Sequence, residues 1–293
     1  MSQRPDAASA AGGVGAAGAA GAVGAAGVVR AAVLGAGACA GLSALVTGAG
    51  SGIGRAITLR LVELGARVTG LGRRAETLAE TGSLAAAPGR YDYEVCDVRE
   101  PDAVTAAVAR TGARHGLGLL VNNAGGQFFA PATGISANGW RAVVDLNLTA
   151  VFTVTMAAYP FLARAGGSVV TISLSGVERG GMGMAHSIAA RAGVLGLTRT
   201  LALEWAEDGV RLNCVGPGTV LTGALNGEAG RHVLDNLVAR GTPMRRPTAP
   251  EEVAELVAFL AGPAGAMMTG QLIQIDGGAH LGAGLHMLAE AYA

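Results

Sequence analysis

Thr47-Gly48-Ala49-Gly50-Ser51-Gly52-Ile53-Gly54 is a glycine-rich turn that connects an apolar run, Ser43–Thr47, to a helical pattern, Ile53–Leu64. Gly48 permits a tight turn, Gly52 lets the backbone approach a ligand, and Gly54 lets the helix pack closely on the strand. The N-terminus of such a helix offers free N–H groups and the positive end of a dipole. The turn therefore predicts a pyrophosphate site that also includes Ser51 and Ile53.

Strand-like and helix-like patterns alternate along the chain from this turn onward. The strand-like runs are Ser43–Thr47, Ala66–Leu71, Tyr91–Val95, Leu117–Asn122, Ser168–Ser173, Val210–Val215 and Gln271–Ile275. The helical patterns are Ile53–Leu64, Glu76–Ala86, Asp102–Arg114, Trp140–Ala163, Ser187–Glu207 and Glu251–Ala261. This alternation predicts an α/β fold: a single Rossmann-type, doubly wound parallel sheet of about seven strands with helices on both faces. Ligands then bind at the carboxyl ends of the strands.

The composition excludes several classes of protein. The chain has 293 residues, is 51% hydrophobic and 14% charged, and has a formal net charge of zero, so neither overall disorder nor nucleic-acid binding is expected. All 21 basic residues are arginine, which indicates a compositional bias. The three cysteines, Cys39, Cys96 and Cys214, are too widely spaced for a metal cluster or a disulfide framework. We expect no metal site and a cytoplasmic location.

The sequence divides into a leader, a domain and a tail. Residues 1–40 are rich in Ala and Gly and predict a flexible leader; a targeting segment is the alternative, but the run is too glycine-rich for a signal peptide or a membrane span. Residues 41–280 form the predicted catalytic domain, in which about 221–247 is a substrate lid, and residues 281–293 form a tail. No membrane association is expected.

Four further motifs follow the glycine turn: Asp97-Val98, Asn122-Asn123-Ala124-Gly125, Asn147 and Pro217-Gly218. With them, residues 42–280 resemble the short-chain dehydrogenase/reductase family. The resemblance implies that Asp97 holds the adenine amino group of a dinucleotide and that Val98 flanks the ring. It also implies that Asn123, Ala124 and Gly125 line the cofactor, that Pro217, Gly218, Val220 and Thr222 meet the nicotinamide carboxamide, and that the protein is a homo-oligomer, either a dimer or a tetramer.

The end of the second strand predicts which dinucleotide binds. An NAD site requires a carboxylate there, but Gly72 occupies that place and Arg73 and Arg74 follow. An arginine fork binds a 2′-phosphate through charge-assisted hydrogen bonds. NADP(H) is therefore the expected cofactor; the alternative is that both arginines are merely solvated at a helix start.

The catalytic segment departs from the usual family set of Asn, Ser, Tyr and Lys. Asn147 is present, but Ser187 stands at the tyrosine position and Arg191 at the lysine position. Leu174 stands at the usual serine position, with Ser173 and Ser175 on either side. The resemblance therefore assigns the catalytic roles to Asn147, Ser187 and Arg191, and it makes Ser173 and Ser175 candidate substrate contacts.

This altered segment resembles the peroxisomal trans-2-enoyl-CoA reductases and, less closely, the 2,4-dienoyl-CoA reductases. Residues 186–194 read H-S-I-A-A-R-A-G-V, residues 201–205 read L-A-L-E-W, and residues 122–128 read N-N-A-G-G-Q-F. The dienoyl enzymes carry an acid tyrosine where this chain has Gly176 and tend to have Asn where Gln127 stands, so the enoyl reading is favoured. Gln127 and Phe128 either line an acyl pocket or simply pack a loop.

The chemistry of enoyl reduction agrees with the missing tyrosine. Ketone reduction needs a proton at oxygen, whereas hydride addition to an enoyl thioester makes an enolate that fixed hydrogen-bond donors can stabilise. Ser187 is then a weak donor or a helix N-cap, and His186 a proton-transfer group or a packing residue. Two other functions stay open: reduction of another carbonyl or alkene, such as a 3-oxoacyl thioester, and a non-catalytic NADP-binding role.

Four arginines fall in or beside the predicted lid: Arg231, Arg240, Arg245 and Arg246. They either meet the phosphates of coenzyme A or lie on a solvated helix.

Overall fold

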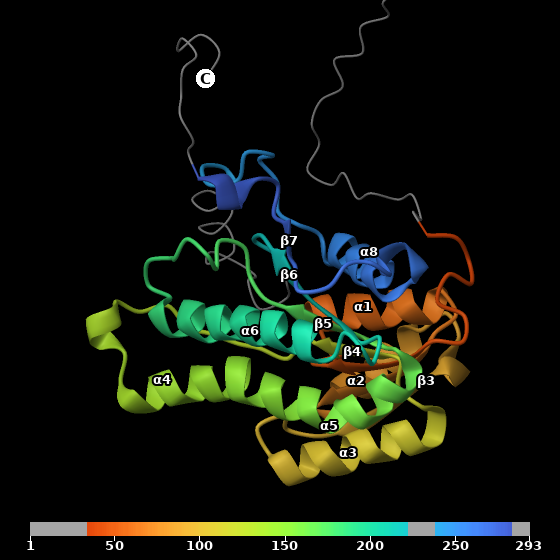
Figure 1. Cartoon of the computed structure of the whole chain (residues 1–293). Helices are drawn as coiled ribbons and strands as arrows, with labels where there is room; N and C mark the ends of the chain where they lie inside the picture. The colour runs from red at the N-terminus through yellow and green to blue at the C-terminus, as the bar shows by residue number, and fades with distance from the viewer. Residues whose placement is uncertain (1–33, 222–237, 283–293) are drawn as a thin grey trace, which may run out of the picture. The chain divides into compact units, whose positions relative to one another are not determined.

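A computed structural model describes residues 34–221 and 238–282, and the centre of the fold is a sheet of seven parallel strands (Figure 1). Their bounds are β1 Ser43–Thr47, β2 Arg67–Gly72, β3 Tyr91–Val95, β4 Leu119–Asn122, β5 Ser168–Ile172, β6 Arg211–Pro217 and β7 Leu272–Ile275. The strand order is β3-β2-β1-β4-β5-β6-β7, so the direction of winding reverses between β1 and β4. A ligand crevice forms at such a reversal. The expected fold class is confirmed.

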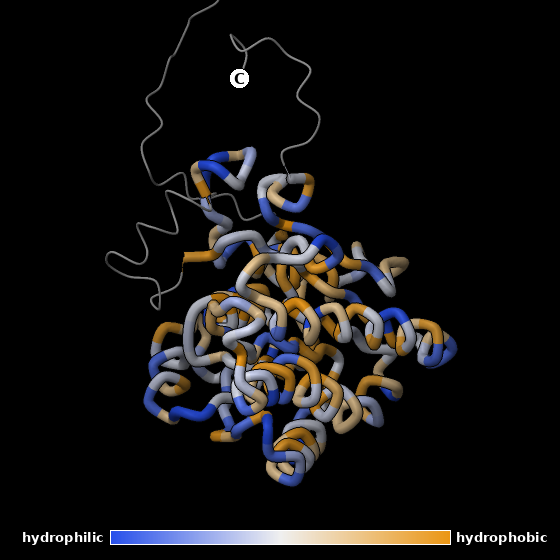
Figure 2. The backbone as a smooth tube through the Cα atoms, turned by 90° about the vertical axis from the view of Figure 1, so that its left-hand side faces the viewer, coloured by the Kyte–Doolittle hydropathy of each residue, from blue (hydrophilic) through white to orange (hydrophobic). Residues whose placement is uncertain are grey.

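Helices cover both faces of this sheet. One face carries α1 (Gly52–Glu63), α2 (Ala75–Leu84) and α8 (Pro250–Ala261); the other carries α3 (Pro101–His115), α5 (Ala150–Ala165) and α6 (Ala185–Glu204). Because side chains alternate along a strand, Val46 packs in the core under α1 and α8, and Leu45 packs in the core under α3 and α5. In Figure 2 the helices alternate between hydrophobic and hydrophilic residues, as expected for helices that bury one face.

The long helix predicted at Trp140–Ala163 is interrupted. The structure has α4 (Ala137–Val144), one π-helical turn (Asp145–Thr149) and then α5. The whole stretch, Ala137–Ala165, is long and apolar enough to cross a membrane by length and composition alone. Core helices pass the same test, and the buried residues of α5, among them Val154, Ala158 and Leu162, pack in the core beside α3.

The N-terminal boundary of the domain differs from the expected one at residue 40. The backbone N–H of Cys39 donates to Leu64 O at 3.0 Å, and Cys39 is only 3% exposed in the core under α1. Leu34 packs against the same core, and its carbonyl accepts from Arg60. Residues 34–40 therefore contact the domain through Leu34 and Cys39, which pack in the core beside α1. The rest of the leader, the tail from residue 283, and 222–237 of the lid, with Thr222, lie outside the described residues.

A protein that begins at residue 41 is expected to melt several degrees below one that begins at residue 34. The shorter protein loses the buried contacts of Leu34 and Cys39. Burying an apolar side chain stabilises by about 1.5–3 kcal/mol, and in a domain of this size about 1 kcal/mol shifts Tm by 2–4 °C. Differential scanning calorimetry of the two truncated proteins measures the difference. Equal melting temperatures would show that residues 34–40 contribute nothing to stability.

Candidate functional site

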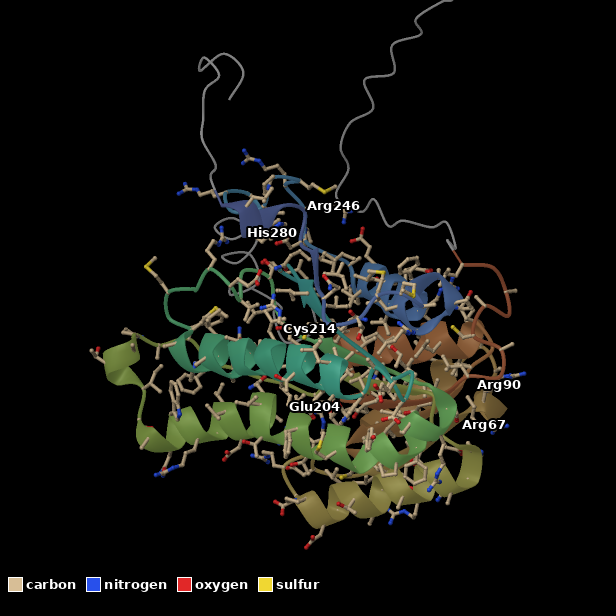
Figure 3. The ribbon with its side chains drawn as sticks, viewed as in Figure 1. Arg67, Arg90, Glu204, Cys214, Arg246 and His280 are labelled. Carbon is tan, nitrogen blue, oxygen red and sulfur yellow. The ribbon has the colours of Figure 1, made fainter. Side chains whose placement is uncertain are left out.

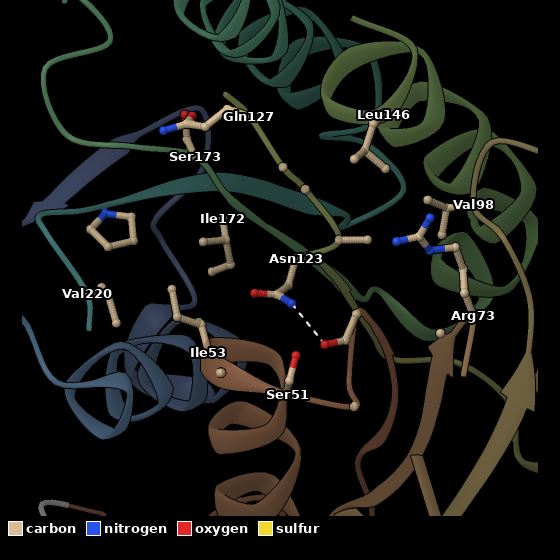
Figure 4. Close-up of a pocket in the computed structure, with 18 of the residues that line it drawn as sticks. Ser51, Ile53, Arg73, Val98, Asn123, Gln127, Leu146, Ile172, Ser173 and Val220 are labelled. Atoms are coloured by element: carbon tan, nitrogen blue, oxygen red, sulfur yellow. Dashed lines mark hydrogen bonds between the residues drawn. The ribbon is translucent and has the colours of Figure 1, made fainter. Parts of the chain in front are cut away.

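A cavity of about 520 Å³ lies at the carboxyl ends of the strands (Figure 4). Residues that directly follow β1 to β6 all line it, which is the arrangement expected for a parallel sheet. The predicted site residues among its walls are Gly48, Ser51, Gly52, Ile53, Arg73, Arg74, Asp97, Val98, Asn123, Ala124, Gly125, Gln127, Ser173, Arg191, Pro217, Gly218 and Val220. The walls include residues that the sequence did not single out, among them Thr77, Cys96 and Leu146.

The glycine turn has the backbone geometry that its sequence predicts. Gly48 and Gly52 adopt φ values of +69° and +51°, a region that favours glycine. A Cβ atom on Gly54 would lie 2.2 Å from Gly48 O and 2.4 Å from Asn123 Nδ2, so Gly54 permits the close packing of α1 rather than lining the cavity. The N–H groups of Gly50 and Ser51 meet no acceptor among the described residues. Unpaired N–H groups at a helix N-terminus fit a pyrophosphate.

The loop after β4 is fastened to the end of β1. Thr47 Oγ accepts hydrogen bonds from the N–H groups of Asn123 and Ala124, each at 2.9 Å, and Asn123 Nδ2 donates to Thr47 O at 3.0 Å. The Asn123 side chain lies next to the turn in Figure 4. These hydrogen bonds hold the glycine turn and the Asn122–Gly125 motif in a fixed arrangement beside the cavity.

The end of the cavity next to β2 and β3 is rich in arginine. Arg73 and Arg74 line it and form no ion pair with any described residue. Asp97 accepts a fork from Arg99, with Nε at 3.0 Å and Nη2 at 2.5 Å, and these hydrogen bonds lower the pKa of Asp97. The sequence did not point to Arg99, although it lies only two residues from the predicted Asp97.

Asn147 lies in the π-helical turn and acts on the loop after β4. Its Nδ2 donates to Val143 O at 2.7 Å and to Gly126 O at 2.8 Å, and its Oδ1 accepts from Gly126 N at 3.2 Å. Asn147 is only 4% exposed and does not line the cavity. It therefore orders the backbone of Gly126, which directly precedes Gln127. A π-turn in a helix is frequently found at a functional site.

Ser187, Gln127 and Arg191 form one hydrogen-bonded cluster. Ser187 Oγ lies 2.5 Å from Gln127 Oε1, Arg191 Nη1 lies 3.3 Å from the same oxygen, and Arg191 Nη1 also donates to Ser187 Oγ. A guanidinium is a donor only, so the amide atom that faces Arg191 must be oxygen. Ser187 consequently gives its only proton to Gln127 Oε1. The NH₂ group of Gln127 is left as the free donor, and Gln127 lines the cavity.

Arg191 is a cation without a carboxylate partner among the described residues. Burial lowers the pKa of Arg191 to about 10, so the guanidinium still carries its charge at neutral pH. Burying an unpaired charge costs free energy, and such a group is retained where a bound molecule supplies the missing partner. Arg191 lines the cavity, and its Nη2 would lie 3.5 Å from a Cβ on Gly125.

The residues flanking this cluster have structural partners. His186 is fully buried, accepts from Ser187 N at 2.8 Å, and meets the Phe128 ring edge-on at 4.3 Å between centroids. Phe128 therefore packs the loop onto α6, and neither it nor His186 lines the cavity. Helix α6 begins at Ala185, so Ser187 lies inside its first turn and is not the N-cap. A side-chain hydrogen bond links Ser175 to Asp276, whereas the buried Ser173 Oγ has no hydrogen-bond partner among the described residues.

The described lid arginines lie apart from this cluster. Arg246, labelled with His280 in Figure 3, forms a fork with Glu252 at 2.6 and 2.8 Å. Arg246, Asp276 and His280 are among the residues that line a second cavity of about 270 Å³. Arg240 and Arg245 are exposed, and Arg231 lies outside the described residues. Within residues 34–221 and 238–282, no group of three or more His, Cys, Asp or Glu side chains is placed to hold a metal ion.

Known proteins share this sequence and fold. A family model described as enoyl-(acyl carrier protein) reductase matches residues 48–280. A probable 2,4-dienoyl-CoA reductase of Bacillus subtilis is 35% identical over 80% of this chain and 94% of its own length. A 3-oxoacyl-[acyl-carrier-protein] reductase of Thermotoga maritima is 36% identical over 80% of this chain and 96% of its own. A citronellol catabolism dehydrogenase of Pseudomonas aeruginosa superposes with a TM-score of 0.75 at 37% identity, over 85% of this chain and 98% of its own.

The parallel sheet, the glycine turn and the cavity at the strand ends define a dinucleotide-binding domain of the Rossmann type. With the family and relatives just described, the chain belongs to the short-chain dehydrogenase/reductase family, whose members use NAD(P)(H). The resemblance predicted from the sequence is confirmed at this level.

Proposed function

We propose that this protein is an NADPH-dependent reductase that acts on the 2,3 double bond of trans-2-enoyl thioesters such as enoyl-CoA. The observation that carries the proposal is the cluster of Ser187, Gln127 and Arg191. In this cluster Ser187 stands at the position where the family usually has an acidic tyrosine, and Gln127, which lines the cavity, keeps its NH₂ group as a free donor.

The residues of the cluster suit the reduction of a thioester. When bound, the reduced nicotinamide supplies a hydride, and hydride addition at C3 leaves negative charge on the thioester oxygen. The NH₂ group of Gln127 donates to that oxygen, because its own carbonyl oxygen is held by Ser187 and Arg191. A fixed donor of this kind stabilises the enolate without reorganising. Protonation at C2 is left to water, since no acidic side chain of the cluster remains free to deliver a proton.

The tyrosines of the described chain argue against ketone reduction. Tyr91 and Tyr93 lie on β3, and Tyr159 donates to Asp208 at 2.6 Å on the outside of α5. None of these three lines the cavity, and Tyr292 lies outside the described residues. Among the described residues, therefore, no phenol lines the cavity to protonate an alkoxide formed from a ketone.

The acid tyrosine of the dienoyl enzymes is also absent. Gly176 stands at that position with a φ of +70°, in a turn that favours glycine. The likeness to a probable 2,4-dienoyl-CoA reductase therefore supports a thioester substrate more than it supports the dienoyl reaction itself. Reduction of a 3-oxoacyl thioester is the second candidate, favoured by the relative from Thermotoga maritima, and a non-catalytic NADP-binding role is the third.

A substrate comparison tests the proposal. NADPH oxidation is measured with crotonyl-CoA, a longer trans-2-enoyl-CoA, a 2,4-dienoyl-CoA, a 3-oxoacyl-CoA and a simple ketone. We expect turnover with the enoyl thioesters and little with the other substrates. Turnover only with the 3-oxoacyl thioester would overturn the proposal, and tight NADPH binding without turnover would favour the non-catalytic role.

NADPH is expected to bind about ten- to a hundredfold more tightly than NADH. Arg73 and Arg74 are free to pair with a 2′-phosphate, and a charge-assisted hydrogen bond contributes about 1.5–3 kcal/mol. Arg73→Ala should remove most of this preference. Arg90→Ala should leave it unchanged, because Arg90 precedes β3 at the opposite ends of the strands, donates to Gly65 O and does not line the cavity. Calorimetric titration of both cofactors measures the ratio. Equal affinities in the parent protein would contradict the NADP assignment.

We further propose that the protein is cytoplasmic and forms a dimer or tetramer. The aromatic side chains of Trp140 on α4 and Phe152 on α5 are 42% and 47% exposed, which supports a self-association surface along this stretch. Sedimentation velocity distinguishes these assemblies, and a monomer would exclude them.

A further inference from the structure

Arg55 on α1 reaches back behind the glycine turn, on the side away from the cavity. Its Nη2 donates to Gly50 O at 2.7 Å, and its Nε donates to Thr81 Oγ at 3.1 Å. The same guanidinium forms a fork with Glu80, with Nη1 at 3.1 Å and Nη2 at 2.6 Å from the two carboxylate oxygens. Glu80 and Thr81 both belong to α2, so one side chain connects the turn to a second helix.

Thr81 holds the neighbouring carbonyl of the same turn. Thr81 is fully buried, and its Oγ lies 3.0 Å from Ala49 O and 3.0 Å from Thr77 O in its own helix. The single hydroxyl proton of Thr81 is shared between these two carbonyl oxygens. Thr81 and Arg55 thus place donors behind consecutive carbonyl groups of the turn, those of Ala49 and Gly50. No other described residue donates to either carbonyl.

These two bonds determine where the amide donors of the turn point. A trans peptide unit is planar, and its C=O and N–H groups point in opposite directions. Holding Ala49 O and Gly50 O on the α2 side therefore directs the N–H groups of Gly50 and Ser51 to the other side. Gly50 and Ser51 line the cavity, and neither N–H group has an acceptor among the described residues.

The same contacts fix how far the turn lies from the arginines at the end of β2. Arg73 and Arg74 directly precede α2, and Thr77, in the first turns of that helix, lines the cavity. A Cβ atom on Gly50 would lie 2.4 Å from Thr77 Oγ, so the turn and the helix touch without space between them. The pairing of Arg55 with Glu80 adds a contact between α2 and the turn.

We propose that Arg55, Glu80 and Thr81 form a clamp that presets the pyrophosphate-binding turn and its distance from the Arg73–Arg74 subsite. All three are positioning residues, because none of them lines the cavity. The proposal rests on dinucleotide binding, which the family shares, and not on the enoyl thioester substrate. If the parent protein prefers NADH, the NADP assignment fails while the clamp is still testable with NADH.

A contribution to binding is expected to exceed any contribution to stability. The side chain of Glu80 is 56% exposed, and exposed ion pairs contribute little to folding. Ordering two amide donors before the ligand arrives, in contrast, removes a cost from binding. The clamp should therefore be visible in cofactor affinity rather than in the melting temperature.

The test compares a whole dinucleotide with one of its fragments. In Arg55→Met, NADPH is expected to bind at least about tenfold more weakly, which corresponds to about 1.4 kcal/mol. Adenosine 2′-phosphate reaches the Arg73–Arg74 subsite and the expected adenine contacts at Asp97 and Val98, but it has no pyrophosphate. It should therefore bind within about twofold of the parent, since those residues are unchanged. Titration calorimetry measures both dissociation constants, and kcat at saturating NADPH should stay close to that of the parent.

Arg60→Met is the matched control, because Arg60 lies on the same helix and forms ion pairs with Glu63 and Glu255 at its other end. It should leave NADPH affinity unchanged. Arg55→Lys should recover part of the affinity, and Thr81→Val, which removes one donor with little change of shape, should weaken NADPH binding by itself.

Three results would overturn the clamp: NADPH affinity unchanged in Arg55→Met, an equal loss for adenosine 2′-phosphate, or an equal loss in Arg60→Met. If Arg55→Met does not fold, Thr81→Val and Glu80→Gln replace it, and normal NADPH affinity in both would reject the proposal.

Discussion

Arg191→Met is expected to lower kcat at saturating NADPH by about a hundredfold, the loss expected when a reacting group is misplaced by about 1 Å. Arg191 is the cation at the position of the family's usual lysine, and it has no carboxylate partner in the described chain. Methionine fills similar space but cannot hold Gln127 Oε1 and Ser187 Oγ. Both the cofactor and the donor amide then lose their orientation, so the chemical step slows even when the cofactor is bound.

Arg191→Lys separates charge from geometry. Lysine keeps the cation but lacks the planar guanidinium whose Nη1 contacts both Gln127 Oε1 and Ser187 Oγ. A partial loss, on the order of tenfold, is expected if the shared contact to Gln127 and Ser187 matters. Stopped-flow measurement of the hydride-transfer step at saturating NADPH provides the comparison. Full activity in Arg191→Lys would mean that charge alone is sufficient, and full activity in Arg191→Met would exclude Arg191 from catalysis.

The cofactor side of the site could be predicted from the sequence because its residues are local to strand ends. Gly48, Arg73 and Asn123 each follow a strand within one or two residues, and in a parallel sheet all those ends meet at one edge. A run that is predicted as a strand is therefore sufficient to place the residue that follows it at the cavity. This prediction from the strand ends does not depend on how the helices pack.

The catalytic side could be predicted only in part, because its geometry depends on contacts between distant segments. The sequence places Ser187 and Arg191 one helical turn apart on α6, but the amide of Gln127 is supplied by a loop 60 residues earlier. Whether Ser187 gives its proton to a substrate or to Gln127 depends on that contact. The clamp of Arg55, Glu80 and Thr81 likewise joins two helices through side chains about 25 residues apart, and no local pattern reveals it.

The N-terminal boundary of the domain could not be predicted from the sequence for the same reason, because it depends on contacts between distant segments. Residues 34–40 have the Ala- and Gly-rich composition of the leader, and composition alone does not distinguish a segment that packs from one that does not. The decisive contacts are Leu34 and Cys39 against α1, which depend on where the end of that helix lies.

Gln127→Leu is expected to lower kcat for enoyl thioesters by about a hundredfold or more, because losing one fixed donor to a developing oxyanion costs about 2.7–4 kcal/mol. The change also leaves the Ser187 hydroxyl and Arg191 without their shared acceptor. Gln127→Asn keeps the amide but shortens it by one methylene, so an intermediate loss is expected. Asn147→Ala should cause a smaller loss of kcat than Gln127→Leu, since Asn147 acts through the backbone of Gly126.

Ser187→Ala provides the sharpest contrast with Gln127→Leu. Its proton goes to Gln127 Oε1 and not to a substrate, so its loss removes one neutral hydrogen bond worth about 1 kcal/mol and should cost about tenfold or less. The expected order of kcat losses at saturating NADPH is therefore Gln127 and Arg191 first, then Asn147, then Ser187. If Ser187→Ala abolishes turnover while Gln127→Leu is mild, Ser187 is the donor to the substrate and the assigned direction of its proton is wrong. NADPH affinity measured in the same variants separates a loss of chemistry from a loss of cofactor binding.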